Sequence, residues 1–112
     1  MPLLQIVTNT TIENNIKFSE KASMLTADIL GKPESYVMVR VQDKQSLIFS
    51  GNNKPAAHVQ LKSLGLAEDK TAEYSSSLCR FIHQELNIDK ARIYIEFINP
   101  ERHLWGWDGK TF

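Results

Sequence analysis

The 112-residue chain contains one cysteine, five glycines, four prolines and no excess of either charge. The single cysteine, Cys79, excludes an intramolecular disulfide framework, and its apolar neighbours favour a small core side chain over a reactive thiol. Thirteen basic side chains balance thirteen acidic ones. The chain therefore lacks the basic excess that is typical of proteins that bind nucleic acid or anionic membranes, and we expect neither partner.

Long apolar runs are missing as well. No run approaches the ~20 residues of a membrane span, and the N-terminus lacks the basic flank and long apolar stretch of a secretory signal. We therefore expect one cytoplasmic domain over residues 1–112, long enough to bury a core.

The patterns of metal and cofactor sites are also absent. His58, His83 and His103 are 25 and 20 residues apart and there is no second cysteine, which argues against a zinc site. The sequence has no glycine-rich phosphate loop. We expect neither a metal nor a cofactor.

The first half of the chain has the pattern of a β-α-β unit. Residues 3–7 predict a strand, and Thr10 followed by Glu13 has the spacing of a capping box. A helix should follow and end at Gly31, before a β-rich stretch at 36–43. The apolar positions of this helix recur at helical spacing: Phe18, Ala22, Leu25 and Ile29.

The second half repeats the order. After a short strand at 47–49, residues 57–63 alternate as a strand does, 70–86 predict an amphipathic helix that Asn87 closes, and 92–97 predict another strand. The apolar face of this helix consists of Tyr74, Leu78, Phe81, Ile82 and Leu86.

The two halves are offset by about 57 residues, and each crossover helix must lie on one face of the sheet. We predict an α/β (α+β) fold in which two β-α-β repeats form a four-stranded mixed sheet with two helices on one side. The strands read as apolar on both faces, so the uncovered face calls for assembly of subunits into a cyclic oligomer. The residues behind this expectation are Leu4, Ile6, Val37, Val39, Val41, Ile93, Ile95 and Phe97.

Proline at position two has two interpretations. Proline makes up about 5% of average usage, so its presence there can be an accident. Alternatively, a small second residue permits removal of the initiator methionine, and Pro2 then presents a free secondary amine that can act as a base.

The sequence resembles the macrophage migration inhibitory factor family of the tautomerase superfamily. The resemblance covers the whole chain and rests on "PLLQIVTN" after Met1, "GKPESYV" at 31–37, "SLG" at 63–65, "RIYIEF" at 92–97 and "WGWDGKTF" at the C-terminus. It implies a homotrimer with a sheet-lined central barrel and three active sites at subunit boundaries.

The resemblance also implies keto–enol tautomerisation of a phenylpyruvate-type 2-oxo acid, with Pro2 as the catalytic base. An apolar pocket and the cation of Lys32 would lower the pKa of the Pro2 amine toward neutrality. Lys32 would also attract the substrate carboxylate, and the backbone N–H of Leu64 would donate a hydrogen bond to it. Without the resemblance, Lys32 would only complement the dipole of the preceding helix.

The pocket walls and two departures from the family complete the expectation. The resemblance implies that Tyr94 of the adjacent subunit lines the pocket with Trp105 and Trp107, which by themselves would pass for core aromatics. Glu96 stands where the family carries asparagine, and its carboxylate should repel an anionic substrate unless a cation offsets it. Residues 56–59 lack the Cys-x-x-Cys pair of mammalian members. The alternative function is a non-catalytic signalling or binding protein with a vestigial pocket.

Overall fold

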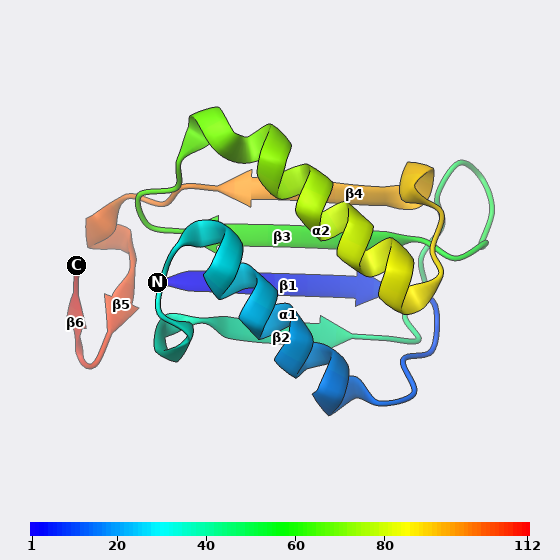
Figure 1. The fold of residues 1–112 in the computed structure, drawn as a ribbon, viewed down its shortest axis with the longest axis horizontal. Coiled ribbons are helices and arrows are strands. Elements are labelled where there is room, and N and C mark those ends of the chain that lie inside the picture. The colour runs from blue at the N-terminus through cyan, green and yellow to red at the C-terminus, as the bar shows by residue number, and fades with distance from the viewer.

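A four-stranded sheet covered on one face by two helices forms the centre of the computed structural model, which describes residues 1–112 (Figure 1). Its strands are β1 (Pro2–Thr8), β2 (Met38–Gln42), β3 (Ala57–Ser63) and β4 (Ile93–Ile98), and its helices are α1 (Asn15–Leu30) and α2 (Thr71–Leu86). The spatial order is β2-β1-β3-β4: β1 is parallel to β2, β3 is parallel to β4, and the two central strands are antiparallel. The predicted mixed sheet of two β-α-β units is confirmed.

The repeat is slightly shorter than predicted, because β3 begins at Ala57 and β1 at Pro2, 55 residues earlier. The strand predicted at 47–49 is wrong: only an isolated bridge joins Phe49 to Asn52. A small C-terminal hairpin, β5 (Gly106–Trp107) and β6 (Lys110–Thr111), was not predicted. Four short 3-10 helices complete the chain: η1 (Glu34–Tyr36), η2 (Glu68–Lys70), η3 (Lys90–Arg92) and η4 (Arg102–Leu104).

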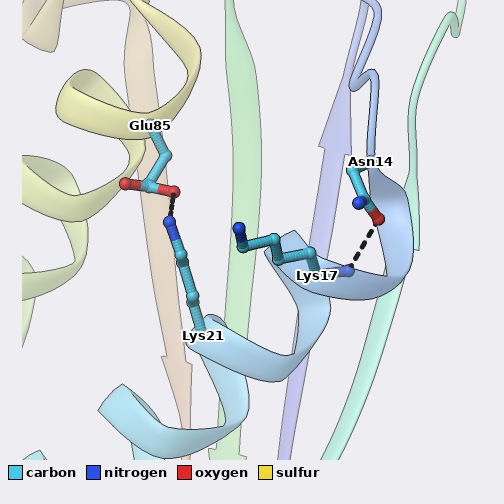
Figure 2. A network of polar contacts seen from close by, with 4 residues as sticks. All are labelled: Asn14, Lys17, Lys21 and Glu85. Carbon is cyan, nitrogen blue, oxygen red and sulfur yellow. Dashed lines mark hydrogen bonds and ion pairs between the residues drawn. The ribbon is translucent and has the colours of Figure 1, made fainter.

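The start of α1 differs from the prediction. The capping box of Thr10 and Glu13 is wrong, because Asn14 caps the helix: its Oδ1 accepts a hydrogen bond of 3.1 Å from the backbone N–H of Lys17 (Figure 2). The hydroxyl of Thr10 donates instead to the carbonyl of its neighbour at 3.3 Å.

Asp43 explains the later start. Its carboxylate accepts hydrogen bonds from the backbone N–H of Ile12 at 3.0 Å and from the side chain of Asn15 at 3.3 Å. These contacts hold the segment before α1 against the end of β2. The two helices are in turn joined where Lys21 of α1 donates to Glu85 of α2 at 3.1 Å (Figure 2).

The core lies between the sheet and the helices. Burial alternates along β1 and β3, as expected for strands with one covered face. Fully buried side chains from the two central strands pack against both helices: Leu4, Ile6, Val59 and Leu61 from the strands, Ala22 from α1, and Leu78 and Ile82 from α2. Cys79 is half-buried and packs against this cluster.

The expectation that both sheet faces are apolar is wrong. Val39, Val41, Ile95 and Phe97 all pack toward the core on the helix-covered face. Because side chains alternate along a strand, their neighbours form the other face. That open face carries mainly polar and charged residues: Gln5, Arg40, Gln42, His58, Gln60, Lys62 and Glu96, with Leu3, Val7, Met38, Tyr94 and Ile98 among them.

No helix combines the length and the apolar character needed to cross a bilayer. The cytoplasmic location stays a prediction.

Candidate active site

The start of β1, the end of α1 and the end of β3 lie together at one end of the sheet (Figure 1). Pro2 pairs with Ser63 in the register of the two central strands. Gly31 ends α1 in the left-handed conformation, with φ of 63°, and the N–H of Lys32 donates back to Ala27 O at 3.0 Å. This turn suits glycine and brings Lys32 to the end of β3.

Lys32 is anchored by hydrogen bonds. Its Nζ donates to Ser63 Oγ at 2.9 Å and to the carbonyl of Leu64 at 2.6 Å. Partial burial lowers the pKa of the Lys32 ammonium. Two of its three N–H groups have partners in the chain, so one remains for a ligand.

An open cavity of about 350 Å³ lies at this end of the sheet. Lys32 and Arg102 supply two cations to its wall, and three of its lining residues are aromatic. None of the lining side chains is acidic. The lining consists of Met1, Lys32, Pro33, Tyr36, Leu64, Arg102, Trp107 and Phe112.

The N-terminal amine lies in this cavity on Met1. Burial, followed by the positive charges of Lys32 and Arg102, lowers the pKa of this amine from its usual value. Pro2 lies directly behind Met1 and its side chain is fully buried. The surroundings of the chain's first residue thus disfavour a protonated amine, which is the condition that a base at this place requires.

Trp105 lies outside the cavity lining. It is half-buried in the C-terminal segment. Its backbone N–H donates to the carbonyl of Arg102, and its carbonyl accepts from the backbone N–H of Phe112, both at 3.2 Å. Of the predicted pocket tryptophans, only Trp107 lines the cavity of its own chain.

Tyr94 and Glu96 also lie away from the cavity, on the open face of β4. Tyr94 pairs with His58, five residues before Ser63 along β3, which places it roughly 17 Å along the strand from the Pro2 end. Its side chain is 65% exposed and packs edge-on against Phe49. Tyr94 therefore cannot reach the cavity of its own chain.

Glu96 has partners on the neighbouring strand. Its Oε1 contacts His58 Nε2 and accepts a hydrogen bond from Gln60 at 3.4 Å. The hydrogen bond from His58 is the main reason why the pKa of the Glu96 carboxyl is lowered. The Glu96 carboxylate is therefore held by His58 and Gln60 on the open face, and His58 is a partner that the sequence did not predict.

Four lining residues were missed: Pro33, Tyr36, Arg102 and Phe112. Tyr36 lies within the "GKPESYV" segment, which is one of the stretches that carry the family resemblance. Arg102 and Phe112 reach the cavity because the C-terminal segment folds back through the β5–β6 hairpin, which stacks the rings of Trp107 and Phe112 at 6.1 Å. Two-residue strands have no periodicity that a sequence could reveal.

A second hollow, of about 410 Å³, lies between the start of α1 and the end of α2 and includes Lys21 and Glu85 in its wall. It contains none of the predicted site residues. The structure has no group of three or more His, Cys, Asp or Glu side chains placed to hold a metal ion.

Comparisons with known proteins agree with this architecture. The model of the family "Macrophage migration inhibitory factor (MIF)" matches residues 1–112. The macrophage migration inhibitory factor homolog of Brugia malayi is 39% identical over 100% of this chain and 99% of its own length, and that of Trichuris trichiura is 37% identical over the full length of both.

Solved structures give the same result. The macrophage migration inhibitory factor of Trichinella spiralis superposes with a TM-score of 0.92 at 33% identity, covering 98% of this chain and 99% of that one. The homologue from Prochlorococcus marinus has a TM-score of 0.92 at 38% identity, covering 98% of each chain. With a family match over its entire length and relatives of this similarity, the chain belongs to the macrophage migration inhibitory factor family.

Proposed function

We propose that the protein is a keto–enol tautomerase of phenylpyruvate-type 2-oxo acids that uses Pro2, after removal of Met1, as its base. The observation that carries this proposal is the cavity at the start of β1, where burial and two cations lower the pKa of the Met1 amine, next to Pro2. After removal of Met1, the amine of Pro2 would lie close to the same two cations. An amine that is neutral near pH 7 can take and return a proton within one catalytic cycle.

The reaction needs only proton transfer. The neutral Pro2 nitrogen accepts the proton of the enol hydroxyl, and the electron pair of that O–H bond forms the carbonyl. The electrons of the C=C bond then take the proton from the Pro2 ammonium at carbon 3. The substrate is isomerised, no atom is gained or lost, and Pro2 returns to its neutral form.

The cavity wall supports the orientation of such a substrate. The remaining N–H of Lys32 suits the carboxylate beside the carbonyl, and the N–H of Leu64 is proposed to donate to the same group. Trp107 and Phe112 offer an aromatic surface to the substrate ring. No cofactor takes part in this scheme.

We further propose that the active unit is a homotrimer with sites at subunit boundaries. Tyr94 lies at the wrong end of its own sheet for the Pro2 cavity, so a role for it requires a second copy of the chain. We place Trp105 and Glu96 at the same subunit boundary, together with His58, which contacts Glu96.

The test compares Pro2→Gly with the wild type in phenylpyruvate ketonisation, with Pro55→Gly at an exposed position as the matched control. We expect Pro2→Gly to lower kcat/KM by at least about 100-fold, in the range of a lost acid–base group, and Pro55→Gly to leave it unchanged.

Retention of Met1 provides an independent test. With Met1 attached, the Pro2 nitrogen is a tertiary amide without a basic lone pair. Activity should therefore follow the fraction of chains that begin at Pro2, measured by intact mass. A homogeneous sample that keeps Met1 and turns over substrate at the processed rate would refute Pro2 as the base.

The second candidate is a non-catalytic signalling or binding protein with a vestigial pocket. It is favoured by the relatives, whose names refer to inhibition of macrophage migration rather than to an enzymatic reaction. Equal ketonisation rates of wild type and Pro2→Gly would favour it over the tautomerase.

A further inference from the structure

We infer that Arg92 and Phe49 are positioning residues, which hold the ring of Tyr94 in the orientation that contacts a substrate in the neighbouring subunit. The inference rests on the proposed tautomerase function and on its shared site. Arg92 and Phe49 were not among the site residues predicted from the sequence, and neither lines the cavity of its own chain.

Tyr94 is exposed on the open face of β4, and Phe49 is the aromatic side chain that packs against it. The two ring centroids are 4.9 Å apart and the ring planes meet at 72°, an edge-on contact. An exposed tyrosine without such a contact can change between staggered rotamers. The contact with Phe49 therefore restricts the direction in which the Tyr94 ring points.

The ring of Phe49 is in turn held by Arg92. The guanidinium carbon of Arg92 lies 5.1 Å from the centroid of this ring, which is a cation–π contact. Arg92 ends η3, two residues before Tyr94. The ring of Phe49 thus contacts both side chains, and its position depends on where the guanidinium is fixed.

The guanidinium of Arg92 is fixed by the loop between β2 and β3. Its Nε donates to the carbonyl of Pro55 at 2.9 Å, Nη1 to that of Phe49 at 3.1 Å, and Nη2 to those of Lys54 and Asn52 at 2.9 and 3.4 Å. A guanidinium has five N–H donors, so only one is left without a partner in the chain. Arg92 is therefore suited to order this loop rather than to bind a ligand.

The loop presents Phe49 at a tight turn. Phe49 and Asn52 form an isolated bridge across Ser50 and Gly51, whose φ angles are both positive, 54° and 77°. Two successive positive φ angles are typical of a type I′ turn. Figure 1 shows the loop beyond the end of the sheet opposite to the N-terminus, so a second copy of the chain would bring the turn and Tyr94 to the cavity together.

A double-mutant cycle in phenylpyruvate ketonisation tests this role. Arg92→Gln should raise KM about tenfold and leave kcat unchanged, because a contact with bound substrate is weakened while the base is untouched. In the Tyr94→Ala background the same substitution should change KM by less than about twofold, since the side chain that it positions is gone. Arg80→Gln, at an exposed position on α2, removes the same charge elsewhere and should keep the wild-type KM.

Phe49→Leu gives a second cycle, because it removes the edge-on contact and leaves the backbone acceptors of Arg92 in place. Light scattering and thermal unfolding show whether each variant is folded and assembled, and if Arg92→Gln is not, the cycle with Phe49→Leu decides. A purely structural role would give the same loss with and without Tyr94. Equal losses in both backgrounds, or a wild-type KM in Arg92→Gln or in Tyr94→Ala, would overturn the inference.

Fluorine NMR separates this inference from the proposed function. Labelling with 3-fluorotyrosine gives signals from three tyrosines, and the signal missing in Tyr94→Phe belongs to Tyr94. Arg92→Gln should shift this signal although both rings remain. If it does while Pro2→Gly is as active as the wild type, the tautomerase proposal fails and the positioning of Tyr94 stands. If Pro2 is required but the Tyr94 signal does not move, the positioning role fails alone.

Discussion

The side chain of Lys32 is held in place by the protein before any ligand binds. A free lysine side chain loses up to about 2 kcal/mol of conformational entropy when it is fixed. Here Ser63 and Leu64 already fix the ammonium, so capture of a carboxylate costs little further ordering at this residue. Partial burial of the same ammonium lowers its pKa.

The charge of Lys32 should be visible in the pH dependence of catalysis. The active form of the base is the neutral amine, so kcat/KM should rise with pH through the pKa of that amine. Lys32 lowers the pKa of the Met1 amine at this place, and its charge should act in the same way on the amine of Pro2 once Met1 is removed. Lys32→Gln removes that charge. We expect the rising limb of the pH–rate profile to move to higher pH in this variant.

Lys17→Gln, an exposed change at the far end of α1, serves as the control and should leave the limb in place. Rates of phenylpyruvate ketonisation measured from pH 5 to 9 give the midpoint for each protein. An unchanged midpoint in Lys17→Gln together with an unchanged midpoint in Lys32→Gln would show that Lys32 does not act on the base.

Site residues differed in how far the sequence could place them. Gly31 predicted the helix end, and the turn there brings Lys32 to the wall of the cavity. Arg102 could not be predicted, because its position depends on how the C-terminal segment folds back over the cavity. The pairing of His58 with Glu96 was missed for a related reason: it depends on the register of β3 with β4, which joins residues far apart in the sequence.

At the scale of elements, the start of α1 has a direct test. Asn14→Ala removes the side chain that accepts from the N–H of Lys17 and should lower the free energy of unfolding by about 1 kcal/mol. Thr10→Ala changes the residue that the sequence pattern favoured as the cap, and its effect should be much smaller, since its hydroxyl contacts only an adjacent carbonyl. Urea denaturation of both variants measures the difference, and equal losses would contradict the assigned cap.

Regular elements were predictable because their periodicity extends over many residues. The strand at 57–63 has its predicted bounds, and α2 begins one residue later than expected. Which face of the sheet each strand side chain occupies was not predictable in the same way. Val39 and Ile95 are apolar, but only their partners in the register decide that both lie on the helix-covered face.

At the scale of the whole molecule, a shared site predicts complementation between two defective chains. Pro2→Gly lacks the base, and Tyr94→Ala lacks the side chain proposed to serve a neighbouring subunit. In mixed trimers, Pro2 of one chain can meet Tyr94 of the other. We expect dissociated and reassembled mixtures to be more active than either parent.

Light scattering should show three chains in every preparation. A mixture of Pro2→Gly with the double variant Pro2→Gly/Tyr94→Ala contains no Pro2 and should stay inactive. A wild type that is active as a monomer would contradict the shared site, as would mixtures that recover no activity although both parents are impaired.

The internal repeat has a consequence for the opposite end of the sheet. Both helices end in a left-handed turn, α1 at Gly31 and α2 at Asn87, and Figure 1 shows these turns at opposite ends of the molecule. The residue after the first turn is Lys32, which borders the cavity, whereas the residue after the second is Ile88, which is fully buried.

The strand beside the second turn, β3, starts in mid-chain at Ala57 and so has an amide where β1 can have an amine. The repeated architecture thus has two corresponding places, and the second has the buried, apolar Ile88 where the first has Lys32. A chain has a single amino terminus, so the repeat provides two corresponding strand starts but only one amine.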